Sequence, residues 1–212
     1  MTNDDVGHES ARTEARPAGD AGPAPVRSGG RRLTVLTGGA RSGKSRLALD
    51  LAADAAGPDG PVVFVATCPR IDGDGDLARR IDAHRAERPT HWTTVESEVD
   101  LATTLAAADP EAVVVIDCLT LWVNNLLFRD HDEAAIVDAA EATLAAACAR
   151  SSQTIAVTNE VGLGIVPGDE LSRSYRDALG RVNQRWIAAA DRALFLVAGR
   201  ALALHDPRDL LA

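Results

Sequence analysis

Cysteine is scarce in this chain of 212 residues, and its spacing argues against two kinds of protein. Cys68, Cys118 and Cys148 are odd in number and form no C-x-x-C pair. A disulfide-stabilised secreted domain needs paired cysteines, and a zinc site needs ligands at short, regular spacing. We therefore expect reduced thiols, as in a cytoplasmic protein, with neither a disulfide framework nor a zinc site.

Long hydrophobic runs and an excess of positive charge are also missing. No apolar stretch approaches the roughly 20 residues that a membrane-spanning helix needs, and the first residues lack the apolar core of a secretory signal. The formal net charge is −9, whereas a protein that binds nucleic acid over a broad surface is typically basic. We expect a soluble cytoplasmic protein with no membrane span and no nucleic-acid partner.

Hydrophobic residues make up 46% of the chain, as in a folded globular protein, but they are not evenly distributed. Residues 1–30 are rich in Ala, Pro, Gly, Arg and acidic residues and have almost no large apolar side chain. Such a segment cannot bury enough surface to offset the entropy of ordering it. The sequence predicts a disordered tail over 1–30 and one folded domain over 31–212. A partner-docking arm is the alternative for the tail, without a motif to support it.

From residue 32 the chain alternates short apolar runs with helical segments. The runs predict strands at 33–37, 62–66, 92–95, 112–117, 154–158, 193–197 and 202–204. Helices are expected over 45–56, 76–87, 99–108, 119–128, 134–150 and 171–190. This alternation predicts βαβ units and hence an α/β fold, with a mostly parallel sheet flanked by helices. Ligands of such sheets bind at the carboxyl ends of the strands.

The most informative motif is a glycine-rich segment directly after the first predicted strand. Gly38, Gly43, Lys44 and Ser45 match the phosphate-loop spacing G-x-x-x-x-G-K-[ST]. The glycines let backbone N–H groups converge on a phosphate, and the helix N-terminus adds its positive end. Lys44 would reach the β- and γ-phosphates, and the Ser45 hydroxyl would ligate Mg²⁺. We interpret the segment as a nucleotide site; the alternative is a glycine-rich turn that binds nothing.

Asp117 and His84 are the further candidates for phosphate chemistry. Asp117 ends a predicted strand and is the natural second partner of Mg²⁺ in a phosphate-loop enzyme, unless it only caps the following helix. His84 lies in a charged segment that, on composition alone, predicts a solvated helix. However, Arg80, Arg85 and Arg88 concentrate positive charge suited to phosphates, and a neutral imidazole is a nucleophile. On the residues alone, both interpretations of His84 stay open.

Three other features have two interpretations each. The segment 157–167 is rich in glycine and apolar residues, which favours either a substrate-covering loop or a packed connection. The apolar helix predicted over 119–128 could lie in the core or at a subunit interface. Arg176 and Arg181, on the last long predicted helix, could face an anion or solvent.

Together these segments resemble the bifunctional adenosylcobinamide kinase/adenosylcobinamide-phosphate guanylyltransferases of cobalamin biosynthesis. The resemblance extends over about 33–197, with Trp92 and Glu96 among the matching residues. The matching blocks are TGGARSGKS at 37–45, RIDAHRAERP at 80–89, IDCLTLWVNNLL at 116–127, VTNEVGLGIVP at 157–167 and RDALGRVNQ at 176–184. Four blocks that follow the phosphate loop in the same order are far more specific than that loop alone. The resemblance implies a P-loop NTPase-like (RecA-like) fold.

In activity, the resemblance implies two successive transfers. The γ-phosphate of ATP or GTP goes to the hydroxyl of adenosylcobinamide, and GMP from GTP then goes to the resulting phosphate, giving adenosylcobinamide-GDP. Mg²⁺ is the implied cofactor, and the implied assembly is a homo-oligomer, a trimer in the family. The alternatives are a single-activity small-molecule kinase on the same fold and a nucleotide-dependent switch or ATPase.

The resemblance also assigns site residues, by the motif positions that match. The GMP–histidine intermediate of the family falls on His84, so His84 and Lys44 are the expected catalytic residues. Ser45 and Asp117 are the expected metal ligands. The expected nucleotide contacts are Gly38, Gly39, Ala40, Arg41, Ser42, Gly43, Lys44, Ser45, Ala66, Thr67, Cys68, Arg85, Ala86, Glu87, Arg88, Glu96 and Asp117.

Overall fold

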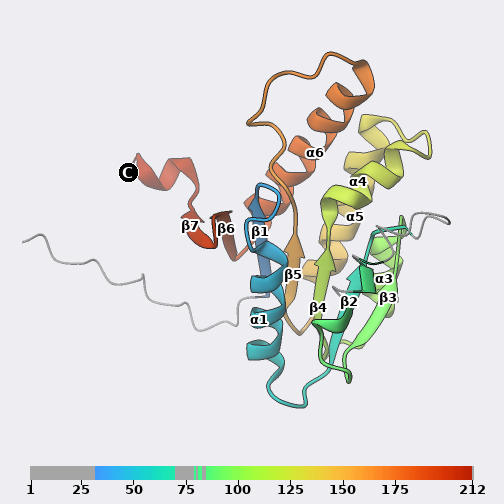
Figure 1. The fold of residues 1–212 in the computed structure, drawn as a ribbon, viewed down its shortest axis with the longest axis vertical. Helices are drawn as coiled ribbons and strands as arrows, with labels where there is room; N and C mark the ends of the chain where they lie inside the picture. Colours follow the sequence, from blue (N-terminus) through green and yellow to red (C-terminus); the bar gives the residue numbers. More distant parts are fainter. Residues whose placement is uncertain (1–31, 70–78, 80, 83–84, 212) are drawn as a thin grey trace, which may run out of the picture.

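One twisted sheet runs through the computed structural model, which describes residues 32–69, 79, 81–82 and 85–211 (Figure 1). In this described part, seven strands pair in the order β3-β2-β4-β5-β1-β6-β7. The strands are β1 (Leu33–Gly38), β2 (Val62–Ala66), β3 (Thr93–Glu96), β4 (Val113–Asp117), β5 (Thr154–Val157), β6 (Arg192–Val197) and β7 (Arg200–Leu204). Strands β1 to β6 pair in parallel, and β7 pairs antiparallel to β6. The predicted α/β class with a mostly parallel sheet is confirmed.

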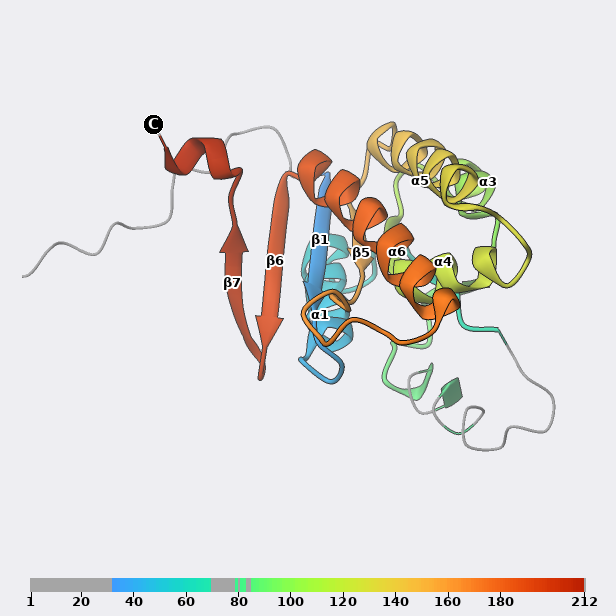
Figure 2. The same cartoon turned by 90° about the horizontal axis from the view of Figure 1, so that it is seen from above.

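Helices cover both faces of this sheet. They are α1 (Lys44–Ala56), α3 (Leu101–Ala107), α4 (Leu119–Leu127), α5 (Glu133–Cys148), α6 (Glu170–Ala189) and the 3₁₀ helix η1 (Pro207–Leu210). Helix α1 lies on the side of the sheet opposite α5 and α6 (Figure 2). The predicted helices and strands in the described residues are confirmed within two residues at almost every end. Half of the helix expected over 76–87 lies outside the described residues, and residues 79, 81, 82, 85 and 86 are helical. The tail expected over 1–30 lies wholly outside them.

Two separate cores result from the alternation of side chains along the strands. On β4, Val113 and Val115 pack in the core under α1, whereas Val114 and Ile116 pack in the larger core under α3 to α6. Because helices cover both faces of the sheet, the strand side chains on either face are buried, and neither set needs to be polar. This explains why the strands appear in the sequence as continuous apolar runs.

Helix α4 belongs to the larger core. Leu119, Trp122 and Val123 are fully buried, and the Trp122 indole donates a hydrogen bond to the Val99 carbonyl at 2.6 Å. Its polar interruption also has a partner, because the Asn125 amide donates to the carbonyls of the β2–β3 and β3–α3 connections. The core interpretation of this helix is therefore confirmed.

Arg150 joins the end of α5 to the end of α3. Its guanidinium is buried and donates hydrogen bonds to four backbone carbonyls, those of Leu105 at 3.0 Å, Ala108 at 3.3 Å, Asp109 at 2.7 Å and Ala112 at 2.8 Å. Carbonyls at the end of a helix have no partner within the helix. One side chain thus supplies donors to four carbonyls at the end of α3 and in the α3–β4 connection.

Replacing Arg150 by Ala should lower the free energy of unfolding by about 3 kcal/mol. The estimate follows from losing several charge-assisted hydrogen bonds and leaving buried acceptors without partners. Chemical denaturation of the two proteins measures the difference. Arg185→Ala is the matched control, because Arg185 forms an exposed ion pair with Glu141, worth less than about 1 kcal/mol. Equal destabilisation by the two substitutions would contradict the role given to Arg150.

Candidate active site

The phosphate loop connects β1 to α1 at the carboxyl edge of the sheet. Gly38 has a φ of 140°, and Gly43, the N-cap of α1, has a φ of 100°. Both values lie where a side chain is strained. Gly38 has a second constraint, because a Cβ there would overlap the carbonyl oxygen of Leu196 on β6. The glycines of the motif are thus required by this backbone, and the loop opens toward the N-terminus of α1.

Neighbouring strands hold the loop in place. Gly199, in the turn between β6 and β7, donates its N–H to the Ser42 carbonyl at 3.0 Å. Glu160, just after β5, donates its N–H to the Gly38 carbonyl at 3.2 Å. The loop is therefore fixed from both sides, as a preorganised phosphate site requires.

Lys44 is folded back onto the loop. Its ammonium donates to the Gly38 carbonyl at 3.0 Å, the Gly39 carbonyl at 2.7 Å and the Ser42 hydroxyl at 3.3 Å. Burial lowers the pKa of Lys44, and the neighbouring Cys118 and Asp117 partly oppose this shift. A bound phosphate would offer the buried ammonium a stronger, charged acceptor than these carbonyls.

A cavity of about 480 Å³ opens in front of this loop. Its walls come from four parts of the chain: the loop with the first residues of α1, the segment before β3, the end of β4 and the end of β5. The lining residues are Ala40, Arg41, Ser42, Gly43, Lys44, Ser45, Arg46, Glu87, Asp117, Cys118, Val157 and Asn159. The structure thus brings together eight residues predicted from the sequence for nucleotide or metal binding.

Asp117 faces this cavity from the end of β4. In the sheet register it pairs with Ala66 on β2 and with Val157 on β5, so the carboxyl ends of these strands align. The N-cap of α4 is Cys118, not Asp117, so the helix-capping alternative for Asp117 is not observed. Asp117 and Ser45 line one cavity, and their two oxygen ligands suit Mg²⁺ that also binds phosphates. In the described part of the chain, no group of three or more His, Cys, Asp or Glu could hold a metal.

The turn after β2 lies beside Asp117 but does not line the cavity. Thr67 is fully buried, and its hydroxyl donates to the Cys118 carbonyl and accepts from the Cys118 N–H, both at 2.8 Å. Burial raises the pKa of Cys118 to about 12 and also raises the pKa of the half-buried Cys68. Both side chains are therefore neutral thiols at physiological pH. The nucleotide contacts expected from 66–68 stay a prediction.

The charged segment before β3 reaches the site through its last residues. Glu87 lines the cavity, and the Arg88 guanidinium lies 4.0 Å from the centre of the Phe64 ring and donates to the Thr94 hydroxyl at 3.2 Å. Such a stacked cation stabilises the packing of the segment on β2 and β3. The other residues expected here to contact nucleotide are exposed and do not line the cavity: Arg85, Ala86 and Glu96. His84 and Arg80 lie outside the described residues.

The segment after β5 has its apolar side chains exposed. Leu163 is 78% and Ile165 98% exposed, and Val166 is also exposed. Because these side chains are exposed, and because neither Gly162 nor Gly164 has a positive φ, the interpretation as a packed connection is wrong. Whether the segment covers a substrate stays a prediction.

Two arginines on α6 have partners in the protein. Arg181 forms an ion pair with Glu133 on α5, and Arg176 forms one with its neighbour Asp177 at 2.9 Å. Both pairs are partly exposed. These arginines therefore face carboxylates at the surface and do not line the cavity.

A family model matches nearly all of the residues that the structure describes. It is the model of cobinamide kinase / cobinamide phosphate guanyltransferase, and it matches residues 34–204. The chain belongs to this family. The match includes the phosphate loop, the strand that ends at Asp117 and the segment after β5, so the resemblance seen in the sequence is confirmed.

Curated members of the cobinamide kinase / cobinamide phosphate guanyltransferase family are similar to the chain over most of its length. The bifunctional adenosylcobalamin biosynthesis protein CobP of Pseudomonas aeruginosa is 43% identical over 171 residues, 80% of this chain and 95% of that protein. The bifunctional adenosylcobalamin biosynthesis proteins CobU of Escherichia coli and Salmonella typhimurium are each 41% identical over 180 residues, 79% of this chain and 96% of theirs. Among solved structures, the flagellar accessory protein FlaH from Methanocaldococcus jannaschii has a TM-score of 0.45 and 12% identity, covering 82% of this chain and 77% of that one. This last similarity is weak.

Four residues that line the cavity in this family member were not among the predicted nucleotide or metal contacts: Arg46, Cys118, Val157 and Asn159. Val157 and Asn159 do belong to the segment 157–167, for which a substrate-covering loop was one of the two interpretations. Cys118 and Asn159 follow two neighbouring strands, and their place after a strand end was the available signal.

No helix in the described part of the chain has both the length and the apolar composition needed to cross a bilayer.

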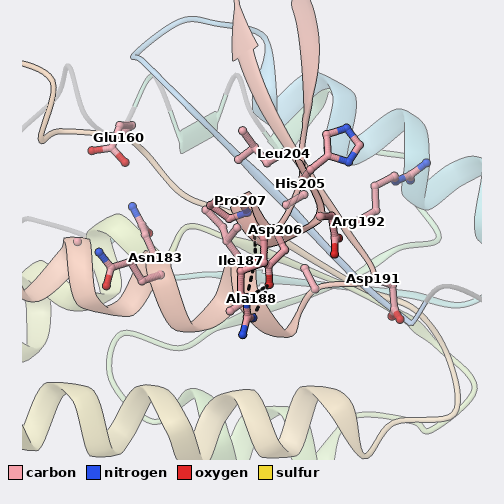
Figure 3. A pocket seen from close by; sticks show the side chains of 16 residues that line it. Glu160, Asn183, Ile187, Ala188, Asp191, Arg192, Leu204, His205, Asp206 and Pro207 are labelled. Carbon is pink, nitrogen blue, oxygen red and sulfur yellow. Dashed lines mark hydrogen bonds and ion pairs between the residues drawn. The ribbon is translucent and has the colours of Figure 1, made fainter. Parts of the chain in front are cut away.

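A second cavity, of about 750 Å³, lies between α6 and the segment formed by β6, β7 and η1 (Figure 3). Glu160 and Asn183 lie at one end of it, and Asp191 and Arg192 lie toward the other (Figure 3). Asn159 lines the first cavity. Glu160 directly follows Asn159 in the chain, and the Asn183 amide donates a hydrogen bond to the Asn159 carbonyl. The two cavities therefore adjoin at the end of β5.

Proposed function

We propose that the chain carries out both transfers of its family. In the first, the γ-phosphate of ATP or GTP goes to the hydroxyl of adenosylcobinamide. In the second, GMP from GTP goes to adenosylcobinamide phosphate, giving adenosylcobinamide-GDP and pyrophosphate. The observation that supports this most is a phosphate loop facing Asp117 across one cavity, in a chain that matches relatives named as bifunctional over nearly their full length.

For the first transfer, the residues around the cavity supply positioning and charge. The loop N–H groups and Lys44 bind the phosphates and stabilise the charge that develops on the transferred group. Ser45 and Asp117 would hold Mg²⁺, which neutralises phosphate charge when bound. The fixed loop keeps the phosphates in line with an acceptor, which is the main requirement of phosphoryl transfer.

For the second transfer, His84 is the proposed nucleophile. A nitrogen of its neutral imidazole attacks the α-phosphorus of GTP, a P–N bond forms, and the bond to the leaving pyrophosphate breaks. A phosphate oxygen of the acceptor then attacks the same phosphorus, and the P–N bond breaks. Support comes from the sequence block around His84 and from Glu87, three residues later, which lines the cavity.

Other features of this proposal concern the setting of the enzyme. We infer a homo-oligomer, a trimer by the family resemblance, because β7 is an exposed sheet edge with apolar Leu202 and Leu204 at its surface. We infer a cytoplasmic location, in keeping with free cysteines at each position that the structure describes. Mg²⁺ as cofactor belongs to the same proposal.

Mass analysis of the corrinoid products tests the proposed function. The purified protein is incubated with Mg²⁺, adenosylcobinamide and either GTP alone or ATP alone. With GTP we expect adenosylcobinamide phosphate and adenosylcobinamide-GDP, and the ATP reaction stops at the phosphate because it lacks a GMP donor. The phosphate as the sole product with GTP would favour a single-activity kinase. Nucleotide hydrolysis without a modified corrinoid would favour a switch or ATPase.

A further inference from the structure

Four polar residues, three through their side chains and Asn159 through its backbone as well, form a closed ring of hydrogen bonds directly behind the first cavity. Thr120 comes from α4, Thr158 and Asn159 follow β5, and Asn183 comes from α6. Thr120, Thr158 and Asn183 are at most 6% exposed, whereas Asn159 reaches the cavity. We call these four residues the polar ring.

The bonds of the polar ring run from one element to the next. The Asn159 N–H and its side-chain amide donate to the Thr120 hydroxyl at 2.7 and 3.2 Å. The hydroxyls of Thr120 and Thr158 are 3.3 Å apart, and Thr158 donates to Asn183 Oδ1 at 2.7 Å. Asn183 Nδ2 closes the ring by donating to the Asn159 carbonyl at 3.0 Å.

This closed arrangement determines which way each group points. Asn183 must direct its NH₂ toward the Asn159 carbonyl, which can only accept, so its oxygen faces Thr158. The single hydroxyl proton of Thr158 is then used on Asn183, and Thr120 donates to Thr158. The Asn159 side-chain atom beside the Thr120 hydroxyl is Nδ2, which donates to it at 3.2 Å. Asn159 is therefore fixed with Oδ1 on the far side from Thr120.

This orientation gives the cavity an acceptor on one wall. Asn159 lines the cavity, and within the described part of the chain its Oδ1 has no hydrogen-bond partner. The cavity is also lined by donors, namely the loop N–H groups and the cations Arg41, Lys44 and Arg46. Phosphate oxygens only accept at neutral pH and suit these donors. An amide oxygen instead suits a ligand that donates, such as a hydroxyl.

We propose that Asn159 Oδ1 accepts a hydrogen bond from the substrate hydroxyl that attacks the γ-phosphate, and that Thr120, Thr158 and Asn183 are positioning residues for this contact. The inference rests on the proposed function. The hydroxyl oxygen forms the new P–O bond as the bond to the leaving nucleoside diphosphate breaks. An amide oxygen is too weak a base to keep the proton, which passes to an oxygen of the transferred phosphoryl group. Asn159 therefore orients the nucleophile and does not deprotonate it.

The two transfers differ in their need for this contact. The acceptor of the first is a hydroxyl, which has a proton to donate. The acceptor of the second is a phosphate monoester, which is largely a dianion at pH 8 because its second pKa is about 6. The dianion has no proton to donate in a hydrogen bond to the amide oxygen of Asn159. Asn159 should thus matter for the kinase step and not for guanylyl transfer.

The test measures the two steps separately in Asn159→Ala. We expect kcat of adenosylcobinamide phosphorylation to fall by about 10- to 100-fold, the effect of a misplaced nucleophile, with the KM for the nucleotide unchanged. GMP transfer to added adenosylcobinamide phosphate should keep its wild-type rate. Equal loss in both steps would overturn the proposal, because it would indicate a role in binding metal or nucleotide, or in folding. If the wild type phosphorylates no corrinoid, it is the proposed function that fails.

A second pair of variants tests the positioning role and does not depend on Asn159→Ala being folded. Thr158→Val removes the hydroxyl that fixes the amide of Asn183, whereas Thr158→Ser keeps it. We expect the Val variant to lose kinase turnover selectively and the Ser variant to recover it, with guanylyl transfer unchanged in both. Normal phosphorylation by a folded Thr158→Val protein would overturn the positioning role. The positioning role would also be overturned if Thr158→Val and Thr158→Ser both lost phosphorylation and guanylyl transfer.

Discussion

Replacing Lys44 by Ala is expected to lower the turnover of both transfers by at least about 100-fold. The Lys44 ammonium is buried at the base of the cavity and contacts three acceptors of the phosphate loop. No other cation of the loop is buried among the residues described, because Arg41 and Arg46 are not. Without Lys44, the charge that develops on the transferred group loses its closest positive partner. Initial rates of adenosylcobinamide phosphate and adenosylcobinamide-GDP formation measure the effect.

The chain offers a second, independent measurement, because Lys44 is its only lysine. Burial lowers the pKa of Lys44, so its amine is deprotonated and reactive at a lower pH than that of an exposed lysine. In the wild-type protein, an amine-directed reagent followed by peptide mapping should modify Lys44, and GTP with Mg²⁺ should slow this modification. Normal kinase turnover in Lys44→Ala, or modification unaffected by nucleotide, would contradict the role of Lys44. Arg185→Ala serves as the control for the activity measurement.

The elements that define the fold could be read from local patterns. The run at 62–66 coincides with β2, because residues covered on both faces of a parallel sheet are continuously apolar. Gly38 and Gly43 were recognisable because their backbone conformations favour glycine. The alternation of strands and helices then places Asp117 at the same edge as the phosphate loop. Local sequence was sufficient for this much of the site.

Features that depend on distant partners gave no such signal. Arg150 binds carbonyls that lie between 38 and 45 residues earlier in the chain, and a lone Arg after a helix does not reveal them. The orientation of Asn159 depends on Thr120, 39 residues before it, and on Asn183, 24 residues after it. Stacking of Arg88 on Phe64 likewise requires the sheet to be in place. Side-chain orientation in the site is thus a property of the assembled fold.

Replacing His84 by Ala is expected to abolish covalent labelling of the protein by [α-³²P]GTP. The residue lies outside the described part of the chain, so this prediction rests on the family block at 80–89 and on the cavity-lining Glu87 that follows it. In the wild type, the label should be acid-labile and base-stable, as a phosphorus–nitrogen bond to histidine is. Formation of adenosylcobinamide-GDP should fall by at least about 10³-fold, since a lost covalent nucleophile is among the costliest substitutions in an enzyme.

His91→Ala provides the matched control, because His91 is an exposed histidine seven residues further along the chain. It should keep the wild-type label. Phosphorylation of adenosylcobinamide should continue in His84→Ala, since transfer of the γ-phosphate requires no bond to histidine. Undiminished labelling of His84→Ala would show that another residue is the nucleophile. Loss of phosphorylation together with the label would make His84 part of the shared nucleotide site. Retention of configuration at the α-phosphorus in the wild-type reaction is expected as well, because two successive inversions cancel.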